Sequence, residues 1–152
     1  MDNASARSMW GDFLDAHLEY AFAESPKVIR LHDNDKEADQ YAKLAMNGIK
    51  KAVSHSLLGL QYRKEPLPKI GDFIVITDGA GKAQCIARNT SVKLRPFFSI
   101  NEAYAQVDGI GDKSLAQWKT QHWAGFTMEL EPYGRVPRES MIVVCQEFEK
   151  VF

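Results

Sequence analysis

Apolar residues recur at spacings of three and four along two stretches of the N-terminal third of the chain. The first stretch runs from Trp10 to Phe22 and predicts an amphipathic helix. His17 lies within this stripe, so we expect it to be a partly buried packing residue. The second stretch predicts a helix that Asn34 caps and that Gly48 ends, because glycine readily adopts the left-handed conformation found after a helix.

Short apolar runs in the middle and at the end of the chain are typical of β-strands. They are FIVIT at 73–77, AQCIARNTSVKL at 83–94 and MIVVCQEFEKVF at 141–152. The loop DGAGK joins the first two runs as a hairpin. Its glycines lack the spacing of a phosphate-binding loop, so we expect an ordinary turn there.

Two helices are predicted between the hairpin and the last strand. SINE at 99–102 is a serine–glutamate capping box that starts a short helix. Ser114 or Asp112 caps a longer one, whose apolar face includes Trp118 and His122. We expect His122 to be a hydrogen-bonded structural residue. The order of elements predicts an α+β fold, a small curled sheet or β-barrel with helices packed outside.

A length of 152 residues and the absence of repeats or linkers favour one domain. Cys85 and Cys145 lie in apolar, strand-like runs, which indicates buried thiols rather than a disulfide. No residues have metal-ligand spacing, so we expect no metal and no other cofactor. No apolar run is long enough to span a membrane and no signal peptide is recognisable, so we expect a cytoplasmic location.

Charge is distributed unevenly along the chain, although the net charge is only −1. Residues 40–99 hold ten basic and three acidic side chains, whereas both flanking segments are acidic. A local positive excess suits an anion-binding surface. The alternative is that acidic helices fold over the basic segment and neutralise it.

The stretch GIKKAVSHSL places Lys50 and Lys51 just after the end of the second predicted helix. Cations near a helix C-terminus stabilise the helix by about 0.3–1 kcal/mol, which would explain them without any ligand. The other interpretation is that they face an anion.

Four stretches together resemble a known family. They are GIKKAVSHSL, PLPKIGD, GDKSLAQWKTQHWAGF and the final strand. In order and spacing they are similar to the ASCH (activating signal cointegrator homology) family, from about Asp35 to Phe152. The resemblance implies a single ASCH domain over 1–152, with 1–30 as an N-terminal helical extension. It also implies a PUA-like small β-barrel, with a cleft along the lysine motif that binds RNA or a nucleoside.

Some members of this family are amidohydrolases of acetylated cytidine that use a lysine, a threonine three residues later and a glutamate; another has been described as a ribonuclease. Lys50 matches the family lysine, but Lys51 and Val53 stand where the family has threonines. Valine has no hydroxyl group to activate, which weakens the amidohydrolase alternative. The acidic partner would be Asp108 or Asp112.

We therefore expect a protein that binds RNA or a nucleoside in a basic cleft centred on Lys50 and Lys51. The alternative is a hydrolase that acts in that cleft, for which a metal-independent ribonuclease is favoured over an amidohydrolase. His55 is better placed than His122 for proton transfer. Candidate catalytic residues are Lys50, Ser54, His55, Asp108 and Asp112. Candidate nucleic-acid contacts are Lys50, Lys51, Ser56, Arg88, Lys93 and Trp123. The oligomeric state stays open.

Overall fold

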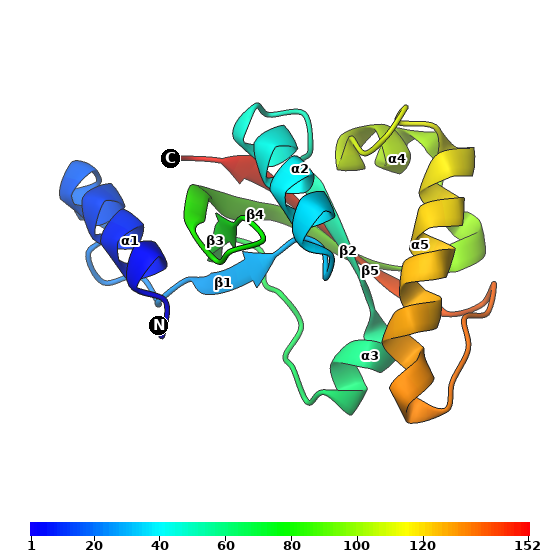
Figure 1. Ribbon diagram of the computed structural model, residues 1–152. Coiled ribbons are helices and arrows are strands. Elements are labelled where there is room, and N and C mark those ends of the chain that lie inside the picture. The colour runs from blue at the N-terminus through cyan, green and yellow to red at the C-terminus, as the bar shows by residue number, and fades with distance from the viewer.

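Five strands form one strongly curled sheet, a half-barrel, in the computed structural model, which describes residues 1–152 (Figure 1). The strands are β1 Lys27–Arg30, β2 Ala52–Ser56, β3 Phe73–Thr77, β4 Ala83–Pro96 and β5 Ile142–Lys150. Their order is β1-β3-β4-β5-β2; only β1 and β3 are parallel. The long strand β4 pairs with β3 from Ala83 to Arg88 and with β5 from Ala87 to Pro96, and its register against β5 shifts between Asn89 and Ser91. A bulge of this kind bends a strand and increases the local twist.

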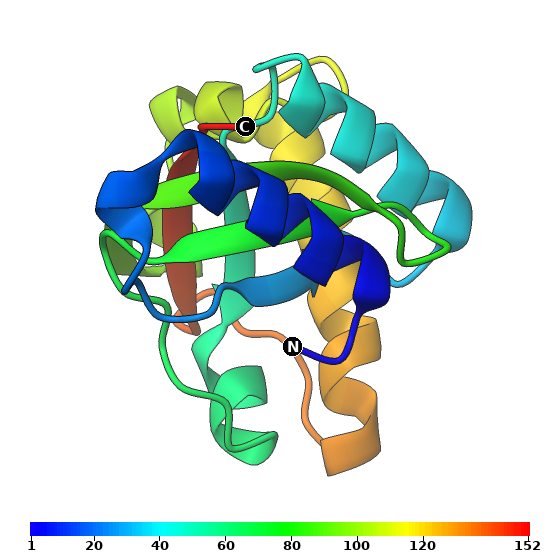
Figure 2. The ribbon, with the colours of Figure 1, turned by 90° about the vertical axis from the view of Figure 1, so that its left-hand side faces the viewer.

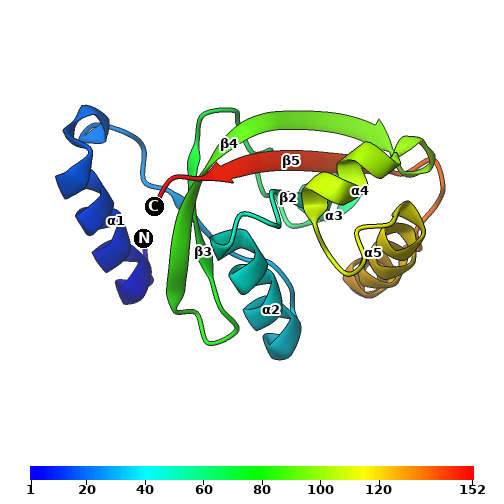
Figure 3. The same ribbon diagram turned by 90° about the horizontal axis from the view of Figure 1, so that it is seen from above.

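Helices cover the sheet on both faces. They are α1 Ala4–Ala16, α2 Asp35–Met46, α3 Leu57–Tyr62, α4 Glu102–Asp108 and α5 Leu115–Leu130, with short 3-10 turns η1 Leu18–Tyr20, η2 Phe97–Ser99 and η3 Glu131–Tyr133. Helices α1 and α2 lie on opposite sides of β3 (Figure 3). All five residues of β3 are therefore buried, with Phe73 and Val75 packed toward α1 and Ile74 and Ile76 in the core that α2 covers. This explains why β3 reads as a continuous apolar run.

A third core cluster joins α4 and α5 to the far end of the sheet. It contains Tyr104, Trp118 and Phe126 from the two helices, packed on Ala52 of β2 and Cys145 of β5. Successive residues of a strand point to opposite faces. Ser54 therefore faces α4 with Ala52, while Val53 and His55 face the other way.

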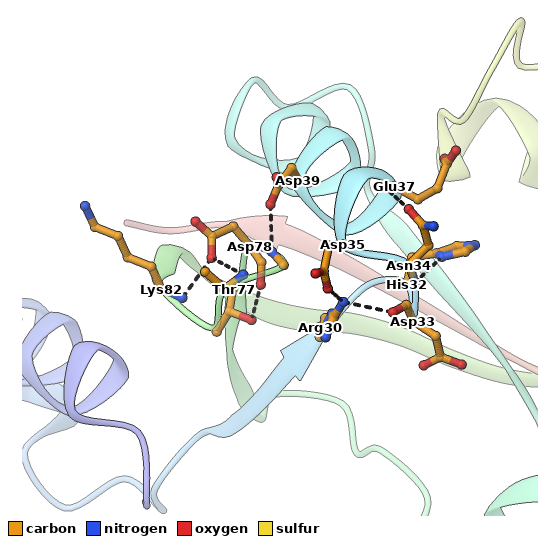
Figure 4. A network of polar contacts seen from close by, with 12 residues as sticks. Arg30, His32, Asp33, Asn34, Asp35, Glu37, Asp39, Thr77, Asp78 and Lys82 are labelled. Carbon is orange, nitrogen blue, oxygen red and sulfur yellow. Dashed lines mark hydrogen bonds and ion pairs between the residues drawn. The ribbon is translucent and has the colours of Figure 1, made fainter.

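The β3–β4 hairpin is fastened to the start of α2 (Figure 4). The Gly79 amide donates to Asp39 across 2.7 Å, and the Asp78 carboxylate accepts from two amides of its own turn. A Cβ at Gly79 would lie 2.6 Å from the Asp35 carbonyl oxygen, so this close approach requires glycine. Asp35 in turn pairs with Arg30 at the end of β1. These contacts connect β1, α2 and the hairpin.

The fold confirms the predicted α+β class with a barrel-like sheet, the two strands of the hairpin and the final strand. Asn34 caps α2, and Gly48 after it has a φ of +70°. Ser114, rather than Asp112, is the N-cap of α5. His17 is partly exposed and packs on the Phe13 ring at 4.6 Å, as expected. Both cysteines are free and buried.

Other sequence predictions were wrong in detail. The first helix ends at Ala16, so Phe22 lies outside it and is fully exposed. Asn101, not Ser99, caps α4, because its side chain accepts from the Tyr104 amide. Residues 1–30 are not only helical, since they end in β1, which pairs with β3 (Figure 2). None of the helices combines the length and apolarity that a membrane-spanning segment needs.

Candidate functional site

Lys50 and Asp108 meet where the ends of α2 and α4 come together. The turn after Gly48 leads Lys50 into β2, and Asp108 is the last residue of α4. The Lys51 amide donates to the Val107 carbonyl across 2.9 Å, which fixes the two segments side by side. Lys50 Nζ then forms an ion pair with Asp108 Oδ1, and the two side chains are only 3% and 0% exposed.

The second oxygen of Asp108 is also occupied. It accepts a hydrogen bond of 2.7 Å from the Trp118 indole and lies 3.5 Å from His122 Nε2. His122 stacks on Trp118 with ring centroids 4.0 Å apart, and its Nδ1 lies 2.9 Å from the Trp118 carbonyl oxygen. Burial lowers the pKa of His122, and the neighbouring Asp108 carboxylate opposes that shift. We call Lys50, Asp108, Trp118 and His122 the ion-pair cluster.

Tyr41 of α2 borders the ion-pair cluster. Its ring centroid is 5.2 Å from Lys50 Nζ, a cation–π distance. Burial, with smaller contributions from Glu37 and Asp108, raises the pKa of Tyr41 to about 12, so its hydroxyl stays protonated. A buried lysine bonded to a carboxylate is engaged inside the protein rather than presented to a phosphate. The polar groups of the cluster therefore bond to one another, and only His122 of the cluster and the bordering Tyr41 are partly exposed.

An open cavity of about 390 Å³ lies elsewhere, between the sheet and the loop before β3. All five strands contribute to its wall, and residues 66–69 and 71–72 of the loop before β3 border it. Ile29, Ile74 and Phe73 give it apolar surface, while His55 and Arg88 bring polar groups. This volume falls within the range of small-molecule sites. We call it the barrel cavity.

Arg88 is held in one orientation at the barrel cavity. Its Nε donates to the Gly71 carbonyl across 3.0 Å and its Nη1 to the Tyr20 hydroxyl across 3.2 Å. The guanidinium also lies 5.3 Å from the Tyr20 ring and 5.0 Å from the Phe73 ring. None of the ion pairs in the protein includes Arg88. Its positive charge is thus oriented but not neutralised by a carboxylate.

His55 begins a chain of side-chain hydrogen bonds at the wall of the cavity. Its Nε2 lies 2.7 Å from Gln146 Oε1. Gln146 Nε2 donates to Asn89 Oδ1 across 2.7 Å, and Asn89 Nδ2 donates to the Lys69 carbonyl across 3.1 Å. Burial lowers the pKa of His55, and the nearby cations Lys27 and Arg63 add to the effect. Neutral His55 is consequently the favoured form at pH 7.

The remaining candidate residues from the sequence lie outside both the ion-pair cluster and the barrel cavity. Ser54 is hydrogen-bonded to the Tyr104 hydroxyl at 2.8 Å, on the face of β2 opposite His55. Ser56 is fully buried and caps α3 by accepting from the Gly59 amide. Trp123 is half-buried with its ring edge against Phe97. The exposed candidates are Lys51, Lys93 and Asp112.

The single cleft expected from the sequence is therefore divided. Lys50 and Asp108 contact each other, whereas His55 and Arg88 line the barrel cavity. Sequence reasoning missed Gln146 and Asn89, although strand alternation puts Gln146 on the same face as its partner Val53. No group of three or more histidine, cysteine, aspartate or glutamate residues is arranged to hold a metal ion.

Comparison with known proteins agrees with this architecture. The family model for the ASCH domain matches residues 27–152. The crystal structure of an ASCH domain from Lactobacillus crispatus superposes with a TM-score of 0.90 at 26% identity, covering 96% of this chain and 93% of the other. Protein EF3133 from Enterococcus faecalis gives a TM-score of 0.87 at 31% identity, covering 97% and 88%. Among curated proteins, no sequence matches this chain significantly.

Proposed function

This chain belongs to the ASCH domain family, and on that premise we propose that it binds single-stranded RNA or a nucleoside-containing ligand in the barrel cavity. The observation that carries the proposal is the oriented, carboxylate-free guanidinium of Arg88. An arginine already fixed by other contacts loses little conformational freedom on binding an anion, and its planar donors match phosphate oxygens. The apolar walls beside it suit the flat faces of a base or a sugar.

Two further cations at the rim support an anionic ligand. Lys27 lies 3.6 Å from Glu65 and Lys69 lies 3.8 Å from Glu24, all on exposed side chains. Exposed ion pairs of this kind contribute about 0–1 kcal/mol to stability, so a phosphate can compete with the carboxylate for either lysine. The cavity thus offers one fixed cation and two exposed ones.

Salt dependence of binding to a short labelled single-stranded RNA tests the proposal. The logarithm of the binding constant should fall with the logarithm of salt concentration by roughly 0.7 for each phosphate contacted. Arg88→Gln should weaken binding and reduce that slope by about 0.7. Lys51→Gln, which removes one exposed cation outside the cavity, is the matched control and should change neither. Equal effects of the two substitutions, or no binding of RNA or nucleotides at low salt, would overturn the proposal.

A metal-independent ribonuclease is the second candidate function, because a neutral histidine and a fixed arginine line one cavity. In such a reaction His55 would take the proton of a ribose 2′-hydroxyl while Arg88 holds the phosphate. The 2′-oxygen would bond to phosphorus and the 5′-oxygen would leave, taking a proton from water. The product to look for is a 2′,3′-cyclic phosphate formed in the presence of a chelator and lost in His55→Gln.

The amidohydrolase alternative has less support. The half-buried Val53 carries no hydroxyl, and the neighbouring Ser54 hydroxyl is bonded to Tyr104 on the opposite face of β2. Lys50 remains a proposed catalytic residue only in company with Asp108, since the two are paired. A reaction at that place would have to open the ion pair first.

A further inference from the structure

The hydrogen-bond chain that starts at His55 ends on a group that can only accept. The last contact is from the Asn89 side chain to the Lys69 backbone carbonyl. Asn89 must therefore direct its NH₂ group toward Lys69 and its oxygen toward Gln146. Gln146 donates to that oxygen and in turn presents its own oxygen to His55. The direction of every bond in the chain follows from one carbonyl.

This direction fixes the tautomer of His55. Because Gln146 Oε1 accepts, His55 Nε2 must carry the hydrogen, which leaves Nδ1 of the neutral ring as an acceptor. Nδ1 makes no hydrogen bond within the protein, and no buried side-chain nitrogen or oxygen atom lacks a partner. Nδ1 is therefore accessible, and His55 lines the barrel cavity. His55 therefore keeps one unused acceptor, Nδ1, and Gln146 sets its tautomer.

We propose that His55 Nδ1 accepts a hydrogen bond from the exocyclic amino group of a bound base, so that the cavity prefers nucleotides of cytosine and adenine over those of uracil and hypoxanthine, which carry a carbonyl oxygen at that position. The inference rests on the proposed function, with Arg88 taking the phosphate. A carbonyl oxygen at the same point would face a lone pair and leave both acceptors without a partner. Burial keeps His55 neutral, so it cannot readily protonate to become a donor.

The burial of Asn89 and Gln146 explains why His55 Nδ1 would remain an acceptor. Asn89 and Gln146 are each 3% exposed, so water does not compete for their amide groups. Rotating the Asn89 amide by 180° would set its Nδ2 against the donating Gln146 Nε2 and its oxygen against the Lys69 carbonyl. Rotating the Gln146 amide would set its oxygen against Asn89 Oδ1. Either arrangement leaves a buried polar atom unpaired. His55 is thus held in one tautomer before a ligand arrives.

Two matched pairs of nucleotides test this preference. Affinities for the 5′-monophosphates of cytidine, uridine, adenosine and inosine are measured by calorimetry at low salt. We expect each amino-bearing member to bind about tenfold tighter than its carbonyl counterpart, the ratio that one unpaired buried group produces. His55→Leu should equalise each pair, while Ser54→Ala, on the opposite face of the same strand, should keep the difference.

The outcomes separate the two proposals. Equal affinities for all four nucleotides would overturn the preference and leave the proposed function standing. Binding of none of them, and of no RNA, would overturn both. The tautomer is measured on the unaltered protein by two-bond ¹⁵N–¹H correlation spectra of the histidine rings. A proton found on Nδ1 of His55 would contradict the inference whatever the variants do.

Discussion

Lys50 and Asp108 form an ion pair that water hardly reaches, with side-chain exposures of 3% and 0%. The pair joins the turn after α2 to the end of α4, and Trp118 of α5 donates to the same carboxylate. The lysine that the family motif places at the centre of the site is therefore engaged with an internal anion. Through Asp108 it connects the turn after α2 with α4 and α5.

Breaking this pair should be costly. In Lys50→Met the lysine stem is roughly preserved, but Asp108 becomes a buried carboxylate without a cation, which typically costs 3–5 kcal/mol. Lys50→Met/Asp108→Asn, whose new amide can still accept from Trp118, should recover much of that loss. Urea denaturation of the two variants measures the difference. If the single substitution lowers the free energy of unfolding by less than about 1 kcal/mol, the ion pair does not stabilise the contact between these segments as we describe.

Gly109 keeps Asp108 in place through its backbone. Its φ is +74°, and a Cβ there would overlap the carbonyl oxygen of Ile49. Gly134 has a similar φ of +68° but nothing within 4 Å of its would-be Cβ. Gly134→Ala should lower the free energy of unfolding only by the strain of the left-handed conformation, roughly 1–2 kcal/mol, which lowers Tm by about 2–8 °C. Gly109→Ala should lower Tm by clearly more in the same melting experiment. Equal losses would show that the contact with Ile49 yields easily.

Stability should decline on mild acidification. Burial lowers the pKa of both His55 and His122 below the ordinary 6.5. Below pH 6.5 the unfolded chain takes up these protons before the folded one does, so the free energy of unfolding falls with falling pH. The free energy of unfolding changes with pH by at most about 1.4 kcal/mol per pH unit for each histidine. This slope is present from pH 6.5 down to the folded-state pKa values.

Denaturation with urea at pH 7, 6 and 5 measures this dependence. His55→Gln and His122→Gln should each remove part of the slope, and the double variant should be nearly flat over this range. A double variant with the full slope would assign the effect to other groups.

Helix α1 should be an integral part of the domain. Phe13 is 1% exposed and packs between Trp10 and Phe73 in the core beneath the helix. Phe13→Ala should lower the free energy of unfolding by about 3–5 kcal/mol. Phe22→Ala changes a side chain of the same type that is fully exposed, and should stay within about 0.5 kcal/mol. Similar values for the two substitutions in chemical denaturation would show that α1 is only loosely attached.

The parts of the fold that follow from local chemistry were predictable from the sequence. Asn34 and Ser114 cap helices because their side chains accept from amides three residues on, and that spacing is visible in the sequence. Strand β3 is apolar throughout because it is covered on both faces. Strand β1 was missed because its four residues belong to the sheet only through pairing with β3, more than forty residues away.

The candidate site was predictable only residue by residue. Lys50 and Asp108 are named by the family motif and its acidic segment, and the structure brings them into contact. Alternation along β2 also puts Ser54 and His55 on opposite faces. What the sequence could not convey is that the curl of the sheet opens a cavity beside His55 and brings Arg88 of β4 to it. That arrangement depends on pairings across the whole sheet.

The position of a bound nucleotide shows whether the barrel cavity is the binding site. Backbone amide spectra of the ¹⁵N-labelled protein are recorded during titration with cytidine 5′-monophosphate. We expect the largest shifts on the amides of Gly71, Asp72, Asn89 and Gln146 at the barrel cavity. Shifts confined to Lys50, Lys51, Asp108 and His122, with the cavity amides unchanged, would contradict binding at that cavity.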